Sequence, residues 1–480
     1  MNWSSYQPPR PAGDEEYDVH GNLIVAEPEM ELAPVPVTNK AKPAPTGIRR
    51  VLAKSRRMEF YKPFHLILMV YLYLYCSRIP ELMPGLHIGA ALQPLLLIGM
   101  FMTGTTKSIF KSDIGKTMFA FTLWIGLCIP FSTWKGGSFT TWITTVQALV
   151  LLFFMAAFIR SIDDCYRAMY MVALAMGTIG ILSMVMGGGT GGSATEVRLG
   201  LGSASDTLSD ANFLALYLVV GIPFIIFALS LKKGLMRVIL FLLLIPVLAG
   251  FARTGSRMGL MALALGMGLF FIFATAIERM AIIFGCILFV ALAVTLLPQK
   301  IAERFTTYFK ASSAAQQEAA SSAETRKMLF LRSLQLTMEH PVLGVGPGEF
   351  MDAEAIDAQE NGKKAMWHFT HNSYTELSSE TGIPGLALFL FAFWRSYSGL
   401  SRIRSKYKYT RVGRGALFLQ IAVLMSCVGA FFLSIAYSGL LYAILGISAA
   451  YKQAVEKESK EYEAAKLQAA AAPVPEPALA

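Results

Sequence analysis

Long apolar runs recur along the chain, and they constrain its fold more than any other feature. Of the 480 residues, 54% are hydrophobic and only 15% are charged, whereas charged residues make up about 25% of a typical soluble domain. Each run is long enough to cross a hydrocarbon core of about 30 Å as a helix. A membrane β-barrel would show a series of ten-residue segments with alternating hydrophobicity, and the sequence contains no such series. The runs therefore predict an all-α, polytopic membrane helical bundle.

Twelve spans can be placed, so we expect about twelve transmembrane helices. They cover residues 63–79, 88–104, 117–132, 140–158, 168–186, 211–230, 236–251, 257–275, 280–297, 383–399, 415–432 and 434–450. The membrane domain then extends over residues 59–452. Residues 1–58, acidic and then rich in Pro and Ala, are expected to form a disordered cytoplasmic tail. Residues 453–480 form a second cytoplasmic tail, first charged and helix-prone and then rich in Ala and Pro.

The basic residues indicate which loops share a face of the membrane. Arg49, Arg50, Lys54, Arg56 and Arg57 precede the first span. If every span crosses, the same face receives Lys107, Lys111, Lys116, Arg160, Arg167, Lys232, Lys233, Arg237 and the acid-free loop 400–414. The positive-inside rule makes this face, and both termini, cytoplasmic. The net charge of +10 is accounted for in this way, and without a recognition motif we expect no nucleic-acid partner.

The opposite face carries one large loop, residues 298–382, which is acidic overall. A loop of this length usually has its own structure or a function. Within residues 324–339, Met328, Leu331, Leu334 and Met338 recur at helical spacing, which predicts an amphipathic helix against the membrane surface. Pro341 follows His340 and should end that helix.

His371 is the candidate catalytic residue of this face. It precedes Asn372, Ser373 and Tyr374 at the mouth of a span, and an imidazole there can accept a proton near neutral pH. The alternative is a surface histidine or one that only completes a turn. His368 lies one turn away, but no third ligand accompanies the pair, so we expect neither a metal nor another cofactor.

Four arginines form the second group of candidates. Arg253 and Arg257 lie between the seventh and eighth spans, Arg326 opens the loop helix, and Arg198 lies in the Gly-rich external loop 187–210. A guanidinium suits the oxygens of a diphosphate because it donates two parallel hydrogen bonds. Snorkelling towards lipid headgroups is the commoner reason for an arginine at a membrane boundary. Together with one histidine, these arginines indicate an anionic, lipid-linked substrate.

Several segments together resemble the O-antigen ligase and O-antigen polymerase superfamily. They are residues 253–265 (RTGSRMGLMALAL), 324–350 (ETRKMLFLRSLQLTMEHPVLGVGPGEF) and 371–390 (HNSYTELSSETGIPGLALFL). Residues 198–218 (RLGLGSASDTLSDANFLALYL) are similar to the family's Arg-to-Asn loop, with Asn212 as the asparagine. The resemblance extends over about residues 190–400.

The resemblance implies a metal-independent, inverting glycosyltransferase of the C-type membrane fold in the bacterial inner membrane. Such enzymes move a glycan from an undecaprenyl-diphosphate carrier to an acceptor hydroxyl, for example on lipid A core, at the periplasmic face during lipopolysaccharide biosynthesis. Residue by residue, it implies His371 as the base and Arg257 and Arg326 as diphosphate ligands. Arg198 and Arg253 match more loosely.

Three alternatives stay open at this point. A polymerase of the same superfamily would use another lipid-linked repeat as acceptor, as in O-antigen or exopolysaccharide synthesis, and a third kind of relative transfers glycan to protein. A transporter of polysaccharide or lipid-linked sugar could also have twelve spans. Against transport, no paired acids or histidines lie in mid-span, and no inverted repeat is evident.

Overall fold

The computed structural model describes residues 45–82, 88–189, 198–202, 207–296, 313–362, 365, 367–408 and 410–470. Residues 46–480 form one compact unit. Its first half contains α1 (Pro45–Ser77), α2 (Ile79–Leu82), α3 (Ile88–Thr103), η1 (Ser108–Lys111), α4 (Asp113–Cys128), η2 (Ile129–Phe131), α5 (Lys135–Phe158), α6 (Ile162–Val185), β1 (Gly188–Gly189) and β2 (Leu199–Gly200). Then follow η3 (Thr207–Ser209), α7 (Ala211–Leu231), α8 (Gly234–Thr254), α9 (Arg257–Phe273), α10 (Ala276–Leu296), α12 (Ser313–Glu339), α13 (Phe350–Glu360), α14 (Ser373–Lys406), α15 (Arg411–Phe432) and α16 (Gly439–Ala470).

The prediction of an all-α membrane protein is confirmed. Each predicted span falls on a helix, and seven described helices are long and apolar enough to cross a membrane. These seven are Asp113–Phe131, Lys135–Phe158, Ile162–Val185, Ala211–Leu231, Gly234–Thr254, Ser373–Lys406 and Arg411–Phe432. Ala91–Thr103 and Arg257–Phe273 are apolar but shorter. The total of twelve crossings therefore stays a prediction.

The two ends of the chain differ in how they match expectation. The disordered N-terminal tail was predicted to reach residue 58, whereas α1 begins at Pro45 and residues 45–58 are helical. Proline fits the first helical position, and the Ala, Arg and Lys residues that follow are good helix formers. At the other end α16 continues to Ala470, in agreement with a helix-prone stretch after residue 452.

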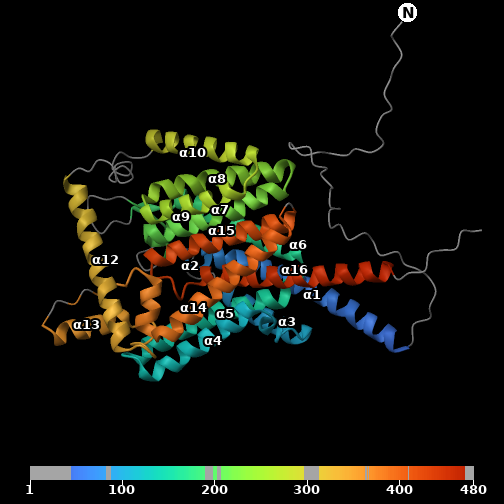
Figure 1. Cartoon of the computed structure of the whole chain (residues 1–480), viewed down its shortest axis with the longest axis horizontal. Coiled ribbons are helices and arrows are strands. Elements are labelled where there is room, and N and C mark those ends of the chain that lie inside the picture. The colour runs from blue at the N-terminus through green and yellow to red at the C-terminus, as the bar shows by residue number, and fades with distance from the viewer. Residues whose placement is uncertain are drawn as a thin grey trace, which may run out of the picture. The chain divides into compact units, whose positions relative to one another are not determined.

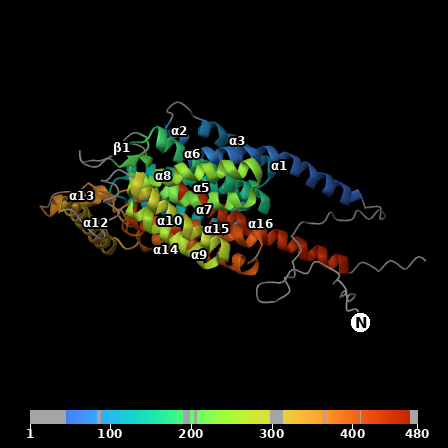
Figure 2. The same cartoon turned by 90° about the horizontal axis from the view of Figure 1, so that it is seen from above.

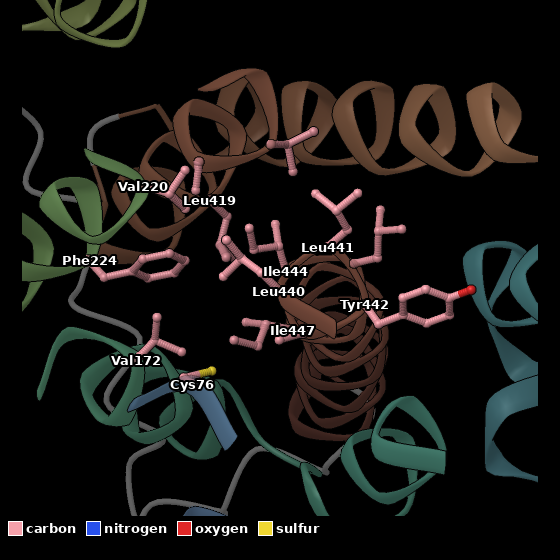
Figure 3. Close-up of a cluster of buried hydrophobic side chains, with 14 of the residues drawn as sticks. Cys76, Val172, Val220, Phe224, Leu419, Leu440, Leu441, Tyr442, Ile444 and Ile447 are labelled. Atoms are coloured by element: carbon pink, nitrogen blue, oxygen red, sulfur yellow. The ribbon is translucent and has the colours of Figure 1, made fainter. Parts of the chain in front are cut away.

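The long helices run side by side, with α6, α7, α8, α14, α15 and α16 among the most closely packed (Figure 1). Their core is apolar. Val172 of α6, Val220 and Phe224 of α7, and Leu419 of α15 gather with residues 440–447 of α16 (Figure 3). In contrast, α8 leaves most of its apolar side chains exposed. An exposed apolar helix face of this kind is suited to contact with lipid.

Helix ends that the predicted topology places on one face lie together. Arg414 at the start of α15 donates to Glu278 at the start of α10 (2.9 Å). Arg395 of α14 pairs with Asp113 at the start of α4, and Lys452 of α16 lies 3.6 Å from the same carboxylate. Arg414, Glu278, Asp113 and Lys452 belong to segments predicted to lie on the cytoplasmic side, and Arg395 lies in the last third of a helix that ends on that side. The ion pairs therefore hold these ends of the helices together.

The opposite end of the bundle carries α12 and α13. Figures 1 and 2 show α12 running across the ends of the long helices rather than along them. The helix ends at Glu339, as His340-Pro341 predicted. Leu329, Ser333 and Leu336 are buried. The predicted apolar stripe of Met328, Leu331, Leu334 and Met338 is exposed and available to a membrane surface.

The helix α14 is interrupted at Gly382, where the large loop was predicted to end. Gly382 has φ 72° and ψ 178°, a conformation open essentially to glycine alone. An unpaired buried carbonyl or amide is costly in free energy. The backbone groups next to the break find hydrogen-bond partners outside the helix. The carbonyls of Ser379, Glu380 and Thr381 accept from Val345 N (2.8 Å), Gly346 N (3.0 Å) and the Trp124 indole (2.8 Å), and Ile383 N donates to Pro341 O (2.8 Å). The segment 341–346 is thereby locked onto the break.

Candidate functional site

Two of the predicted arginines flank the turn between α8 and α9. Gly255, with φ 58°, ends α8 in the left-handed conformation that glycine adopts without steric cost. Ser256 then caps α9 by accepting from Gly259 N (3.3 Å). The cap makes Arg257 the first residue of α9, where it is half-buried, while Arg253 in the last turn of α8 is exposed.

Arg198 is tied to that turn from a different part of the chain. It stands just before β2, and its Nε donates to Thr254 O (3.0 Å). A second guanidinium nitrogen donates to Asn212 Oδ1 (2.8 Å), and the Ser256 hydroxyl donates to the same oxygen (2.9 Å). The start of α7, the α8–α9 turn and the β2 segment therefore meet at one amide oxygen.

His371 is held in an uncommon backbone conformation. Its φ is 51°, which a residue other than glycine keeps only where its surroundings enforce it. Thr370 on one side is buried and bonds the Ser434 hydroxyl (3.0 Å). Asn372 on the other side caps α14 by accepting from Tyr374 N (2.9 Å). Because both neighbouring residues are held by hydrogen bonds, the backbone position from which the His371 side chain extends is fixed.

The surroundings of His371 favour its neutral form. Burial lowers the pKa of the imidazole, the positive charge of Arg326 lowers it further, and Asp210 opposes the shift. A pKa below the ordinary 6.5 leaves the ring unprotonated at neutral pH, so one ring nitrogen can accept a proton. Arg326 and Asp210 are thus the two charges that most affect the pKa of His371, with opposite signs.

The inner face of α12 carries Arg326. Residues 326, 330, 333 and 337 recur at helical spacing and share one face. The Thr337 hydroxyl bonds the Ser378 hydroxyl of α14 (2.8 Å), which fixes this face against α14. Arg326 itself is exposed on the helix above that contact. Sequence spacing predicted the helix, and the contact with α14 fixes which of its faces packs inward.

Sequence reasoning missed Asp210. This residue caps α7 by accepting from Asn212 N (2.7 Å) and Phe213 N (3.1 Å). An aspartate just before an apolar run is a helix-start signal, yet that signal does not show which distant side chain it faces. Because Asp210 lies near His371 and Asn212 holds Arg198 and Ser256, residues 210–212 connect the two halves of the site.

Four of the five predicted residues are therefore associated, as two groups. Arg198 and the turn bearing Arg257 both contact Asn212. The charge of Arg326 lowers the pKa of His371. Arg253 differs. Among the residues that the structure describes, no hydrogen bond or ion pair connects it to the other four.

Buried carboxylates near the break in α14 were also missed. Glu380 accepts from Gly348 N (2.8 Å) and from the Tyr437 hydroxyl (2.7 Å). Glu349 is only 1% exposed. Burial, together with the charges of Asp352 and Glu380, raises the pKa of the Glu349 carboxyl to about 7. Glu380 therefore fastens the loop around residues 344–350 rather than the segment that carries His371.

Glu349 should make stability depend on pH. Its folded-state pKa of about 7 exceeds the ordinary 4.5, so the folded protein binds a proton that the unfolded chain has lost. Stability therefore falls as pH rises from about 5 to 7. We expect Glu349→Gln to flatten this slope and to be more stable than wild type at pH 8, by on the order of 1–3 kcal/mol. Thermal unfolding in detergent across this range measures it.

The matched control for this measurement is Glu360→Gln, since Glu360 is an exposed carboxylate at the end of α13. It should leave the slope unchanged. A Glu349→Gln protein with the wild-type slope would show that Glu349 is ionised in the folded state at pH 5.

Comparison with known families bears on the same region. A family model described as O-antigen ligase matches residues 241–390. The matched stretch contains Arg253, Arg257, Arg326 and His371, while Arg198 precedes it. A comparison with curated proteins finds no match.

Proposed function

Because residues 241–390 carry a domain of the O-antigen ligase superfamily, we propose that the protein transfers a glycan from an undecaprenyl-diphosphate carrier to an acceptor hydroxyl. The acceptor is lipid A core in this proposal. The feature that carries it is His371 at the start of α14, a histidine whose pKa is lowered by burial and then by the charge of Arg326. Together, His371 and Arg326 supply the two things that the reaction needs, a base and a positive charge.

The chemistry assigns one role to each group. Departure of the glycan leaves negative charge on the diphosphate, and fixed guanidinium groups stabilise developing charge in a water-poor site. Arg257 and Arg326 take that role in the proposal, and Arg198, which contacts the α8–α9 turn, and Arg253 are further candidates for it. As the acceptor oxygen attacks the anomeric carbon, His371 takes its proton. One displacement of this kind inverts the anomeric centre, and it needs no metal because the arginines supply the positive charge.

A transfer assay with the purified protein tests this function. The protein would be placed in liposomes with undecaprenyl-diphosphate-linked oligosaccharide and lipid A core. A core-linked product supports the ligase. Ladders of carrier-linked oligomers would instead identify a polymerase, and glycan on added protein would identify the third kind of relative. Labelled donor crossing sealed vesicles without a new glycosidic bond would favour transport.

We also place the protein in the bacterial inner membrane, with both termini cytoplasmic and the active face periplasmic. Two variants with one added cysteine check this orientation: Gln359→Cys on the exposed side of α13 and Ser405→Cys at the exposed end of α14. Both are made in a Cys286→Ser background, because Cys286 is exposed. In intact cells with a permeable outer membrane, an impermeant maleimide should label only position 359. Labelling of position 405 alone would invert the topology.

A further inference from the structure

The side-chain amide of Asn212 has a fixed orientation. Its Oδ1 faces a guanidinium nitrogen of Arg198 at 2.8 Å and the Ser256 hydroxyl at 2.9 Å. A guanidinium can only donate hydrogen bonds, so the amide atom that faces it must be the oxygen. The Ser256 hydroxyl already accepts from Gly259 N (3.3 Å), which leaves its own proton for Asn212. Chemistry thus settles which end of the amide is which.

The other end of the amide is therefore turned away from Arg198 and Ser256. Nδ2 carries two N–H donors, and no hydrogen bond to it occurs within the described part of the chain. The side chain is half-buried rather than immersed in solvent. Polar groups in such places usually find a partner. The partner for this one would come from outside the chain.

The location of Nδ2 indicates what that partner is. Asn212 stands beside Arg198 and the turn that opens with Ser256 and Arg257, and Asp210 two residues away lies within reach of His371. An N–H donor on a side chain that also contacts Arg198 and the Ser256–Arg257 turn fits an anionic oxygen of the carrier. We propose that Asn212 Nδ2 donates to an oxygen of the carrier diphosphate, while its Oδ1 holds Arg198 in position. This inference rests on the proposed glycan transfer from a lipid diphosphate.

Two variants separate donation to substrate from a structural role. Asn212→Asp keeps an acceptor for Arg198 and Ser256 but replaces the N–H donors by a negatively charged oxygen. Asn212→Gln keeps the N–H donors and displaces the amide by one methylene. If Nδ2 binds the diphosphate, affinity falls in the order wild type, Gln, Asp, with Asp weaker by roughly 10- to 100-fold, as for a lost hydrogen bond to a charged group. If Asn212 only holds Arg198, the Asp variant should match wild type and exceed Gln.

Binding is measured separately from catalysis, as the rise in unfolding temperature that a short-chain polyprenyl diphosphate produces in the detergent-solubilised full chain. The expected result is a clear rise for wild type, a smaller rise for Gln and the smallest for Asp. Equal rises for wild type and Asp overturn the inference about Asn212 alone. No rise for wild type, together with no transfer from any lipid-linked donor, overturns the proposed function itself. Should the Asp variant unfold before measurement, a Gln variant with undiminished binding is the overturning result.

Discussion

His371→Ala is expected to lower the rate of glycan transfer by roughly 10²- to 10⁴-fold, the usual range for removal of a general base. His371→Asn should do the same and is the better-matched variant. Asparagine tolerates a positive φ such as the 51° found here, and it cannot titrate near neutral pH. Both proteins should bind the lipid diphosphate with little change, because the arginines remain. Initial rates at saturating donor and acceptor measure the effect.

The control is His368→Ala. His368 lies three residues earlier on the exposed side of the same segment, so its loss should leave at least half of the activity. Full activity in purified His371→Asn would show that the acceptor proton leaves by another route, and it would remove the base from the mechanism.

The pH dependence of the transfer rate gives a second test of His371. The pKa of His371 is lowered below 6.5 by burial and by Arg326 and is raised by Asp210. Transfer should therefore stay near its maximum at pH 7 and fall only on the acid side of 6.5. Loss of the positive charge in Arg326→Gln should move this acid limb to higher pH, and Asp210→Asn should move it to lower pH. An acid limb that stays in place in both variants would show that neither residue faces His371.

The parts of the fold that depend on local pattern could be predicted from the sequence. Apolar runs located the spans because lipid exposure and burial both select apolar side chains, and Pro341 located the end of α12 because proline cannot continue a helix. Residues 45–58, predicted as part of the N-terminal tail, are charged yet helical. Composition alone does not separate an exposed helix from a tail.

Most of the candidate site could not be found in the same way. Sequence position singled out His371, Arg257 and Arg326, and the resemblance assigned their roles. Asp210 and Asn212 gain their roles only when α7 meets the α8–α9 turn and the start of α14. Their local signals are those of any helix start. The burial of the Glu349 and Glu380 carboxylates could not be predicted from the sequence either, since acidic residues are usually exposed. Long-range contacts, rather than spacing, give these residues their chemistry.

Gly382→Ala is expected to be the most damaging single-methyl change outside the site. Its φ of 72° and ψ of 178° cost an alanine roughly 1–3 kcal/mol. In addition, an added Cβ would lie 2.0 Å from Val342 O and 2.8 Å from Pro341 O, both backbone atoms that cannot turn away. The total loss should be about 3 kcal/mol or more, seen as a lower unfolding temperature and a lower yield of folded protein.

The effect should reach transfer activity as well, through the break in α14. The carbonyls freed at Gly382 hold Val345 and Gly346, and this anchored loop connects α12, which bears Arg326, to the helix that begins after His371. Gly268→Ala is the control, because Gly268 lies within α9 and an added Cβ meets nothing within 4 Å. Alanine is also the better helix former, so that variant should be as stable as wild type. If Gly382→Ala behaved like Gly268→Ala, α14 could not be broken at this residue, and the placement of Arg326 beside His371 would need another support.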